Sequence, residues 1–132
     1  VLFGGMSGGA ARLRDTWEWD GTQWQLVASN AGPSGRQGHA MAFDPGRGLV
    51  LLHGGWTGGA NLADLWQWDG AQWSASAAAG PAPTARRDHE MVHDDSLGRM
   101  VLLGGWTGGA PIVGTHVLWT GVEPTRREAP GQ

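Results

Sequence analysis

The 132-residue chain contains no cysteine, no tyrosine and no lysine, and these absences exclude several kinds of chemistry. Without cysteine there is no disulfide framework, no thiolate ligand for a metal and no cysteine nucleophile. No apolar run is long enough to cross a membrane as a helix, which argues against membrane insertion. The formal net charge is −3 and like charges do not cluster, which argues against nucleic acid and anionic membranes as partners.

Glycine and tryptophan are abundant instead, with 24 and 9 residues, and they are arranged in a repeat. An apolar run that ends in a double glycine occurs three times, at 1–10, 51–60 and 101–110. The segments between these runs also recur, with Asp15–Gly21 echoed by Asp64–Gly70 and Pro33–Asp44 echoed by Pro83–Asp94. A period near 50 residues predicts a repetitive architecture and takes precedence over other patterns.

Each repeat unit contains four short segments with strand character, separated by turn residues. The first and fourth segments alternate, the second is a continuous apolar run, and the third places two tryptophans on one face. Strands are expected at 15–19, 23–28, 38–43, 49–53, 64–68, 72–77, 88–93, 99–103 and 115–119. Asp-Gly pairs at 20–21 and 69–70 predict tight hairpin turns. No segment has a sustained helical period, so the predicted fold class is all-β.

The apolar run with its double glycine, followed by two aromatic residues separated by six positions, resembles the kelch motif. Trp17 with Trp24 and Trp66 with Trp73 carry that spacing, with tryptophan where kelch repeats usually have tyrosine. The resemblance, to bacterial kelch-like and galactose-oxidase-like propellers, implies a partial β-propeller of four-stranded antiparallel blades. One blade would be complete and two incomplete, at about 1–30, 31–80 and 81–121. A WD-repeat propeller fits less well because its period is about 40–45 residues.

A closed kelch-type ring needs roughly six or seven such blades, so the chain is expected to be a fragment of a longer propeller. Its partners would then include the remaining blades of the parent chain, because open blade faces expose apolar surface. A ring assembled from identical copies is the alternative. Residues 122–132 are expected to form a loose polar tail. The compartment stays open, with the extracellular space or the cell envelope as the preferred expectation.

The segment from His89 to His93 matches the HExxH pattern of zinc proteases, which needs a helix to bring both imidazoles to one ion. Here the segment aligns with the alternating residues 39–43 and is predicted to be a strand. Residues four apart on a strand are separated by roughly 13 Å, too far to share a zinc ion directly. With no nucleophile elbow and no phosphate-binding loop, the sequence predicts no metal, no cofactor and no catalytic group.

Strand direction places the loop tryptophans at the same end of the blades as the recurring arginines. The candidate ligand-binding residues are Trp56, Trp106, Arg36, Arg86, Arg87 and His53. Arg36 and Arg86 have a second interpretation, in which they pair with aspartates that recur in the repeat and serve the fold.

The functional hypothesis is a binding scaffold for a protein or a carbohydrate. The alternatives are a non-catalytic part of a propeller enzyme and a purely structural repeat. A copper oxidase similar to galactose oxidase would be such an enzyme, but this chain lacks the tyrosine and cysteine its site requires.

Overall fold

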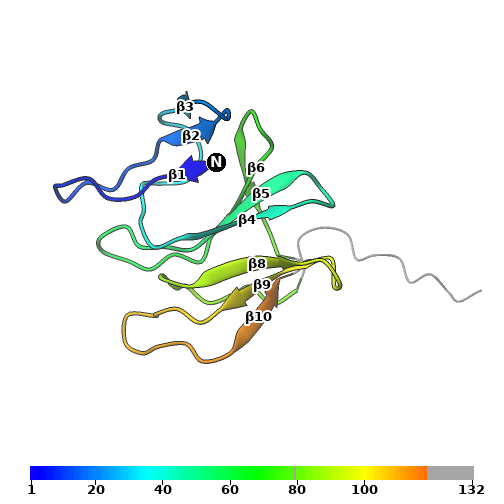
Figure 1. The fold of residues 1–132 in the computed structure, drawn as a ribbon. Coiled ribbons are helices and arrows are strands. Elements are labelled where there is room, and N and C mark those ends of the chain that lie inside the picture. The colour runs from blue at the N-terminus through cyan, green and yellow to red at the C-terminus, as the bar shows by residue number, and fades with distance from the viewer. Residues whose placement is uncertain (79, 119–132) are drawn as a thin grey trace, which may run out of the picture.

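The computed structural model describes residues 1–78 and 80–118, which form ten strands in three antiparallel sheets (Figure 1). The first sheet contains β1 (Leu2–Phe3), β2 (Thr16–Trp19) and β3 (Trp24–Ala28). The middle sheet contains β4 (Ala40–Asp44), β5 (Leu49–His53), β6 (Leu65–Trp68) and β7 (Trp73–Ser76). The last sheet contains β8 (Glu90–Asp94), β9 (Arg99–Leu103) and β10 (Thr115–Leu118).

The described residues contain no helix, and therefore no helix that could cross a membrane, so the all-β prediction is confirmed. Neighbouring strands in each sheet follow one another along the chain, so no connection within a sheet crosses over a strand. Each expected strand is present with bounds shifted by at most two residues. The expectations for Trp119 and for residues 122–132 lie outside the described residues.

Aspartates shape the hairpin turns that the sequence predicted. The carboxylate of Asp20 accepts hydrogen bonds from the backbone N–H groups of Thr22 and Gln23 at 2.8 and 2.9 Å. Asp69 does the same for the two residues at the equivalent places in the middle sheet. The glycine after each aspartate has a positive φ, 101° at Gly21 and 96° at Gly70. These local bonds reverse the chain between the tryptophan-bearing strands and fix their register.

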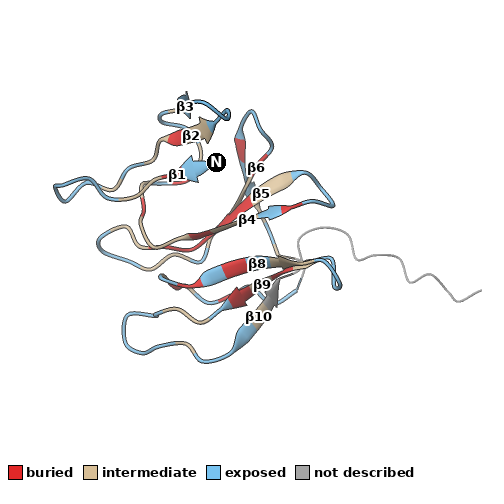
Figure 2. Cartoon of the chain, in the orientation of Figure 1, coloured by how far each residue is buried: buried red, intermediate tan, exposed pale blue. Residues whose placement is uncertain are grey.

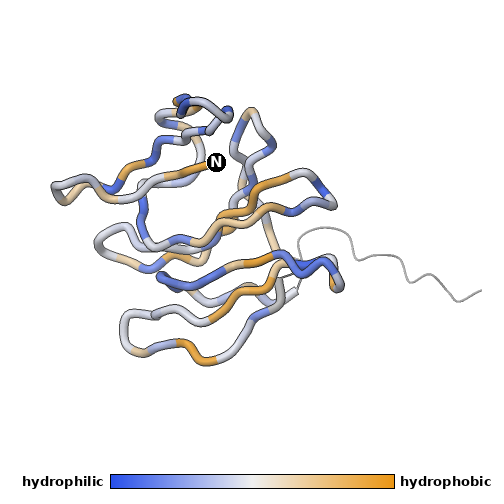
Figure 3. The backbone as a smooth tube through the Cα atoms, viewed as in Figure 1, coloured by the Kyte–Doolittle hydropathy of each residue, from blue (hydrophilic) through white to orange (hydrophobic). Residues whose placement is uncertain are grey.

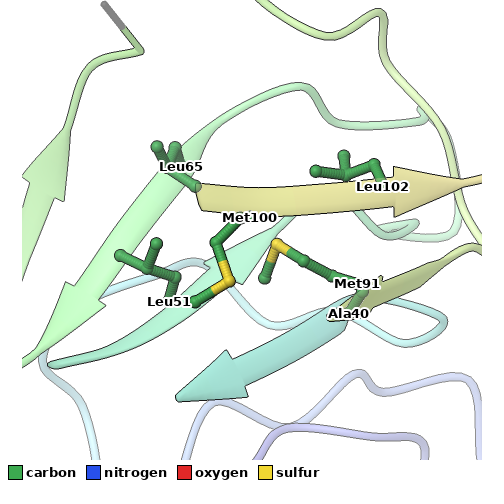
Figure 4. Packing of buried hydrophobic residues seen from close by; sticks show 6 residues of the cluster. All are labelled: Ala40, Leu51, Leu65, Met91, Met100 and Leu102. Carbon is green, nitrogen blue, oxygen red and sulfur yellow. The ribbon is translucent and has the colours of Figure 1, made fainter. Parts of the chain in front are cut away.

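The three sheets stack face to face, with the middle sheet covered on both sides. Figure 4 shows the core between the middle and last sheets, formed by Ala40, Leu51, Leu65, Met91, Met100 and Leu102. The core between the first and middle sheets consists of Phe3, Leu52, Trp68 and Trp73. Successive side chains of β4 point to opposite faces of the middle sheet and so contribute to both cores. Ala40 belongs to the core shared with the last sheet, and Met41 packs against the core shared with the first sheet.

Two indole hydrogen bonds fasten the first sheet to the middle one. Trp68 Nε1 donates to Glu18 Oε1 at 2.9 Å, and Trp73 Nε1 donates to Thr16 Oγ1 at the same distance. The buried segments lie where the sheets face one another (Figure 2), and the hydrophobic stretches of the strands lie in the same places (Figure 3). Full burial of each large apolar side chain here contributes roughly 1.5–3 kcal/mol to folding.

The outward face of the first sheet is open. Leu2, Trp19 and Trp24 are 46%, 52% and 49% exposed. Their equivalents in the middle sheet, which the first sheet covers, are Leu52, Trp68 and Trp73, exposed by 0%, 3% and 8%. Equivalent strand positions with the same residue types are thus buried in the middle sheet, which the first sheet covers, and exposed in the first sheet.

The second glycine of each double glycine lies close to the segment that precedes the first strand of a repeat unit where that segment is present. Gly55 has a φ of 104°, and a Cβ there would lie 2.9 Å from Gln37 O and 3.0 Å from His39 Cβ. Gly5 occupies the equivalent position with a φ of 102°, but a Cβ there would meet nothing within 4 Å.

We expect Gly5→Ala to cost about 1 kcal/mol from backbone strain alone. Gly55→Ala should cost at least about 1 kcal/mol more, because backbone atoms must move. Urea unfolding followed by tryptophan fluorescence measures both, and equal losses would contradict the expectation.

Candidate functional site

Three glycine-rich loops lie on one side of the molecule, at the left of Figure 1, and each joins the second and third strand positions of a repeat unit. Met6, Trp56 and Trp106 occupy the same place in the three loops. Trp56 exchanges two backbone hydrogen bonds with Gln37, at 2.8 and 3.1 Å, and Trp106 does so with Arg87 at the same distances. The backbone of Trp56 is therefore held against the segment that precedes β4, and that of Trp106 against the segment that precedes β8.

The ring of Trp56 is contacted by two guanidinium groups. The Cζ atom of Arg12, from the first loop, lies 4.7 Å from the ring centroid, and that of Arg87 lies 4.6 Å from it. Gly58 makes room for this approach, because a Cβ there would lie only 2.7 Å from Arg12 Nη1. Arg12 also donates to Ala10 O at 2.6 Å. Each cation–π contact at a partly exposed site contributes roughly 0.5–1 kcal/mol.

Trp106, at the equivalent place in the third loop, is 36% exposed. Asn61 stands where Arg12 stands one repeat earlier, and its side-chain nitrogen lies 3.3 Å from a Cβ position at Gly108. Arg12, Trp56, Arg87 and Trp106 thus form a row that draws on all three sheets and the segments between them. We refer to these four residues as the Trp–Arg row.

Arg36, a candidate ligand residue, is instead buried in an ion pair. Its Nη1 and Nη2 donate to the two carboxylate oxygens of Asp64 at 2.5 and 2.7 Å, and Nη1 also donates to Gly54 O. Burial alone would raise the pKa of Asp64, but the hydrogen bonds from Arg36 and from the indole of Trp66 outweigh it and hold this pKa below its usual value. The arrangement supports the interpretation of Arg36 as a residue that ties the loop to the strand.

His53, another candidate, faces His89 across the boundary between the middle and last sheets. His53 Nδ1 and His89 Nε2 are 3.0 Å apart, and both residues are buried. Burial lowers the pKa of His53 to about 3, with further lowering by His89 and Arg86. Burial also lowers the pKa of His89 to about 4. Both imidazoles are therefore neutral at physiological pH, and one donates a hydrogen bond to the other.

The HExxH segment is extended, as the sequence predicted, with His89 directly before strand β8 and the other four motif residues within it. His89 contacts His53, whereas His93 contacts Asp95 at 2.7 Å and Asp44 at 3.8 Å. The two motif histidines thus have separate partners. Across residues 1–78 and 80–118, no group of three or more potential ligands is placed to hold a metal ion.

Arg86 is also buried, at 4% exposure, and Arg87 is partly exposed with Asp88 as an ion-pair partner at 3.7 Å. The structure therefore brings Trp56, Trp106 and Arg87 together at the surface and places Arg36, Arg86 and His53 beneath it. Arg12 was not among the candidates, because nothing in its local sequence marks it. No protein-family model matches the chain, and the search of curated proteins finds no match.

Proposed function

We propose that the chain is part of a kelch-type β-propeller, and that the Trp–Arg row is a binding surface for an acidic segment of a partner protein. Support for the architecture comes from three antiparallel sheets that stack face to face with equivalent residues in equivalent strands. Each sheet would be one blade, complete in the middle and lacking a strand at either side. The period near 50 residues fits such a blade.

The contact of two guanidiniums with the ring of Trp56 is the observation on which the proposed ligand rests. A sugar stacks on a free aromatic face, and the ring of Trp56 is already occupied by Arg12 and Arg87. The guanidiniums carry donors suited to carboxylates, and Trp106 adds a half-open aromatic surface beside them. Tryptophan and arginine are the residues that dominate the energetics of protein interfaces. A protein ligand is therefore favoured over a carbohydrate.

Binding should depend on Trp106. Peptides rich in Asp, Glu and aromatic residues, screened on an array, should bind the chain, and Trp106→Ala should weaken the best binder by about 30-fold or more. Val113→Ala is the matched control, because Val113 lies in the same loop and is 93% exposed. Isothermal titration calorimetry measures both variants. If oligosaccharides bind and acidic peptides do not, the carbohydrate alternative replaces this proposal.

The proposed propeller also needs further blades beside the first sheet, and two features of that sheet support them. The open face with Trp19 and Trp24 has the composition of a face that is buried in the middle sheet. Asp15 Oδ1 is buried and has no hydrogen-bond partner within the described residues, whereas Asp64 Oδ1 at the equivalent place binds Arg36. A preceding inner strand with its own arginine would satisfy Asp15.

Hydroxyl-radical footprinting of a longer polypeptide that contains this chain tests the additional blades. Trp19 and Trp24 should be protected to the level of Trp68 and Trp73. Reactivity equal to that in the 132-residue chain would show that no further blade covers the face. Protection that appears only at high concentration of the 132-residue chain would assign the covering sheet to a second copy.

A further inference from the structure

Arg86 makes the same side-chain hydrogen bonds as Arg36, except for those to a carboxylate. Its Nε donates to Thr84 O at 3.2 Å and its Nη2 to Thr84 Oγ1 at 3.0 Å, as Arg36 does to Ser34. Its Nη1 donates to Gly104 O at 3.1 Å, as Arg36 does to Gly54 O at 3.0 Å. Arg36 then makes its bidentate pair with Asp64, but no carboxylate among the described residues pairs with Arg86.

The missing carboxylate is explained by Gly114. The backbone carbonyl of Asp64 accepts the N–H of Gly54 at 3.2 Å, and that of Gly114 accepts the N–H of Gly104 at the same distance, so the two residues are equivalent. Gly114 has a φ of 97°, and a Cβ there would meet nothing within 4 Å. Among the described residues, no atom other than those of its chain neighbours therefore lies beside the position from which a carboxylate side chain would extend in the last sheet.

We propose that the guanidinium of Arg86 binds a carboxylate that comes from outside this chain, in the place that Asp64 fills beside Arg36. The ligand class is a carboxylate group, either as a small anion or as an Asp or Glu side chain of a partner. Several observations carry this assignment. Arg86 is buried, with 4% of the residue exposed, and its guanidinium is oriented by hydrogen bonds to Thr84 and Gly104.

Two further arguments concern access and charge. Asp64 keeps 39% of its side chain exposed, so a carboxylate in the equivalent position can be reached from solvent. Burial lowers the pKa of Arg86 from its usual value, because no counter-charge compensates the desolvation of the cation. A carboxylate bound by two hydrogen bonds would compensate the charge of Arg86 and accept from its remaining N–H donors. The site does not depend on the proposed function.

Nuclear magnetic resonance of the arginine side chains tests the site directly, with sodium formate as the probe and sodium chloride at equal ionic strength as the reference. The Nε–H resonance of Arg86 should shift saturably with formate in the millimolar range. That of Arg36 should not shift, because Asp64 already occupies its donors. No saturable shift at Arg86, or equal shifts at both arginines, would overturn the proposal.

Exchanging the two sites gives a second test that does not depend on one variant folding. Asp64→Gly should give the Arg36 resonance the formate response of Arg86, and Gly114→Asp should weaken the response of Arg86 by about tenfold or more. An Asp-containing peptide that produces the same shift at lower concentration than formate would identify a partner side chain as the source. If formate acts on Arg86 only after Glu123→Gln and Glu128→Gln, a carboxylate of this chain fills the site and the proposal fails.

Discussion

Replacing Asp64 by asparagine should lower the free energy of unfolding by about 3 kcal/mol. The side chain of Arg36 is 1% exposed, and the substitution leaves its charge buried without a counter-ion. Because the Asp64 side chain is 39% exposed, we expect the lower end of the range that broken buried ion pairs show. Asparagine keeps the shape and can still accept one hydrogen bond, so the loss reports mainly the charge. Urea unfolding followed by tryptophan fluorescence measures it.

Asp15→Asn is the matched control, because Asp15 occupies the same position in the first sheet. Both carboxylates accept a hydrogen bond from an indole, Asp15 from Trp17 and Asp64 from Trp66. Only Asp64 has an arginine on its other oxygen within the described residues. Asp15→Asn should therefore cost less than about 1 kcal/mol. Equal losses in the two variants would mean that the ion pair contributes nothing beyond the indole contact.

The strands were predictable because turn residues mark the ends of the strands in each repeat unit. The continuous apolar run at 49–53 is covered on both faces, as its composition requires, and it forms β5. Double glycines and Asp-Gly pairs mark the turns by conformations that few other residues adopt, with positive φ at Gly55 and Gly70. Because the pattern occurs three times, a strand that is ambiguous in one repeat unit can be assigned from the equivalent segments of the others.

The site was predictable only in part, because it depends on contacts between repeat units. The loop position of Trp56 follows from the sequence, but the approach of Arg12 from another loop does not, since the two residues are 44 positions apart. The sequence places Trp56 at the same end of the blades as the recurring arginines, and the structure sets the guanidiniums of Arg12 and Arg87 against its ring. The pairing of Arg36 with Asp64 followed from their recurrence. The loss of the carboxylate beside Arg86 needed the backbone equivalence of Asp64 and Gly114.

Acid should destabilise the fold well above the pH at which carboxylates titrate. His53 and His89 have pKa values of about 3 and about 4 in the folded chain, against about 6.5 when unfolded. Below pH 6.5 the unfolded chain binds more protons, so stability is complete above that pH and falls as the pH decreases toward the folded values. Each histidine costs about 1.4 kcal/mol per pH unit in this window, or about 2 kcal/mol between pH 6.5 and 5. Urea midpoints at a series of pH values measure the slope.

His53→Phe separates these histidines from other titrating groups, because Phe3 stands at the equivalent position of the first sheet and packs in its core. The variant removes one low-pKa imidazole and the positive charge that would face His89. The slope between pH 6.5 and 5 should fall by about a third, because burial keeps the pKa values of His89 and His39 low in the variant as well. This holds even if stability at pH 7 drops because His89 loses its hydrogen bond. An unchanged slope would assign the acid sensitivity elsewhere, for example to His39, whose pKa burial lowers to about 4. Since the pair spans two sheets, a changed slope would also show that the boundary between the middle and last sheets opens when the chain unfolds in acid.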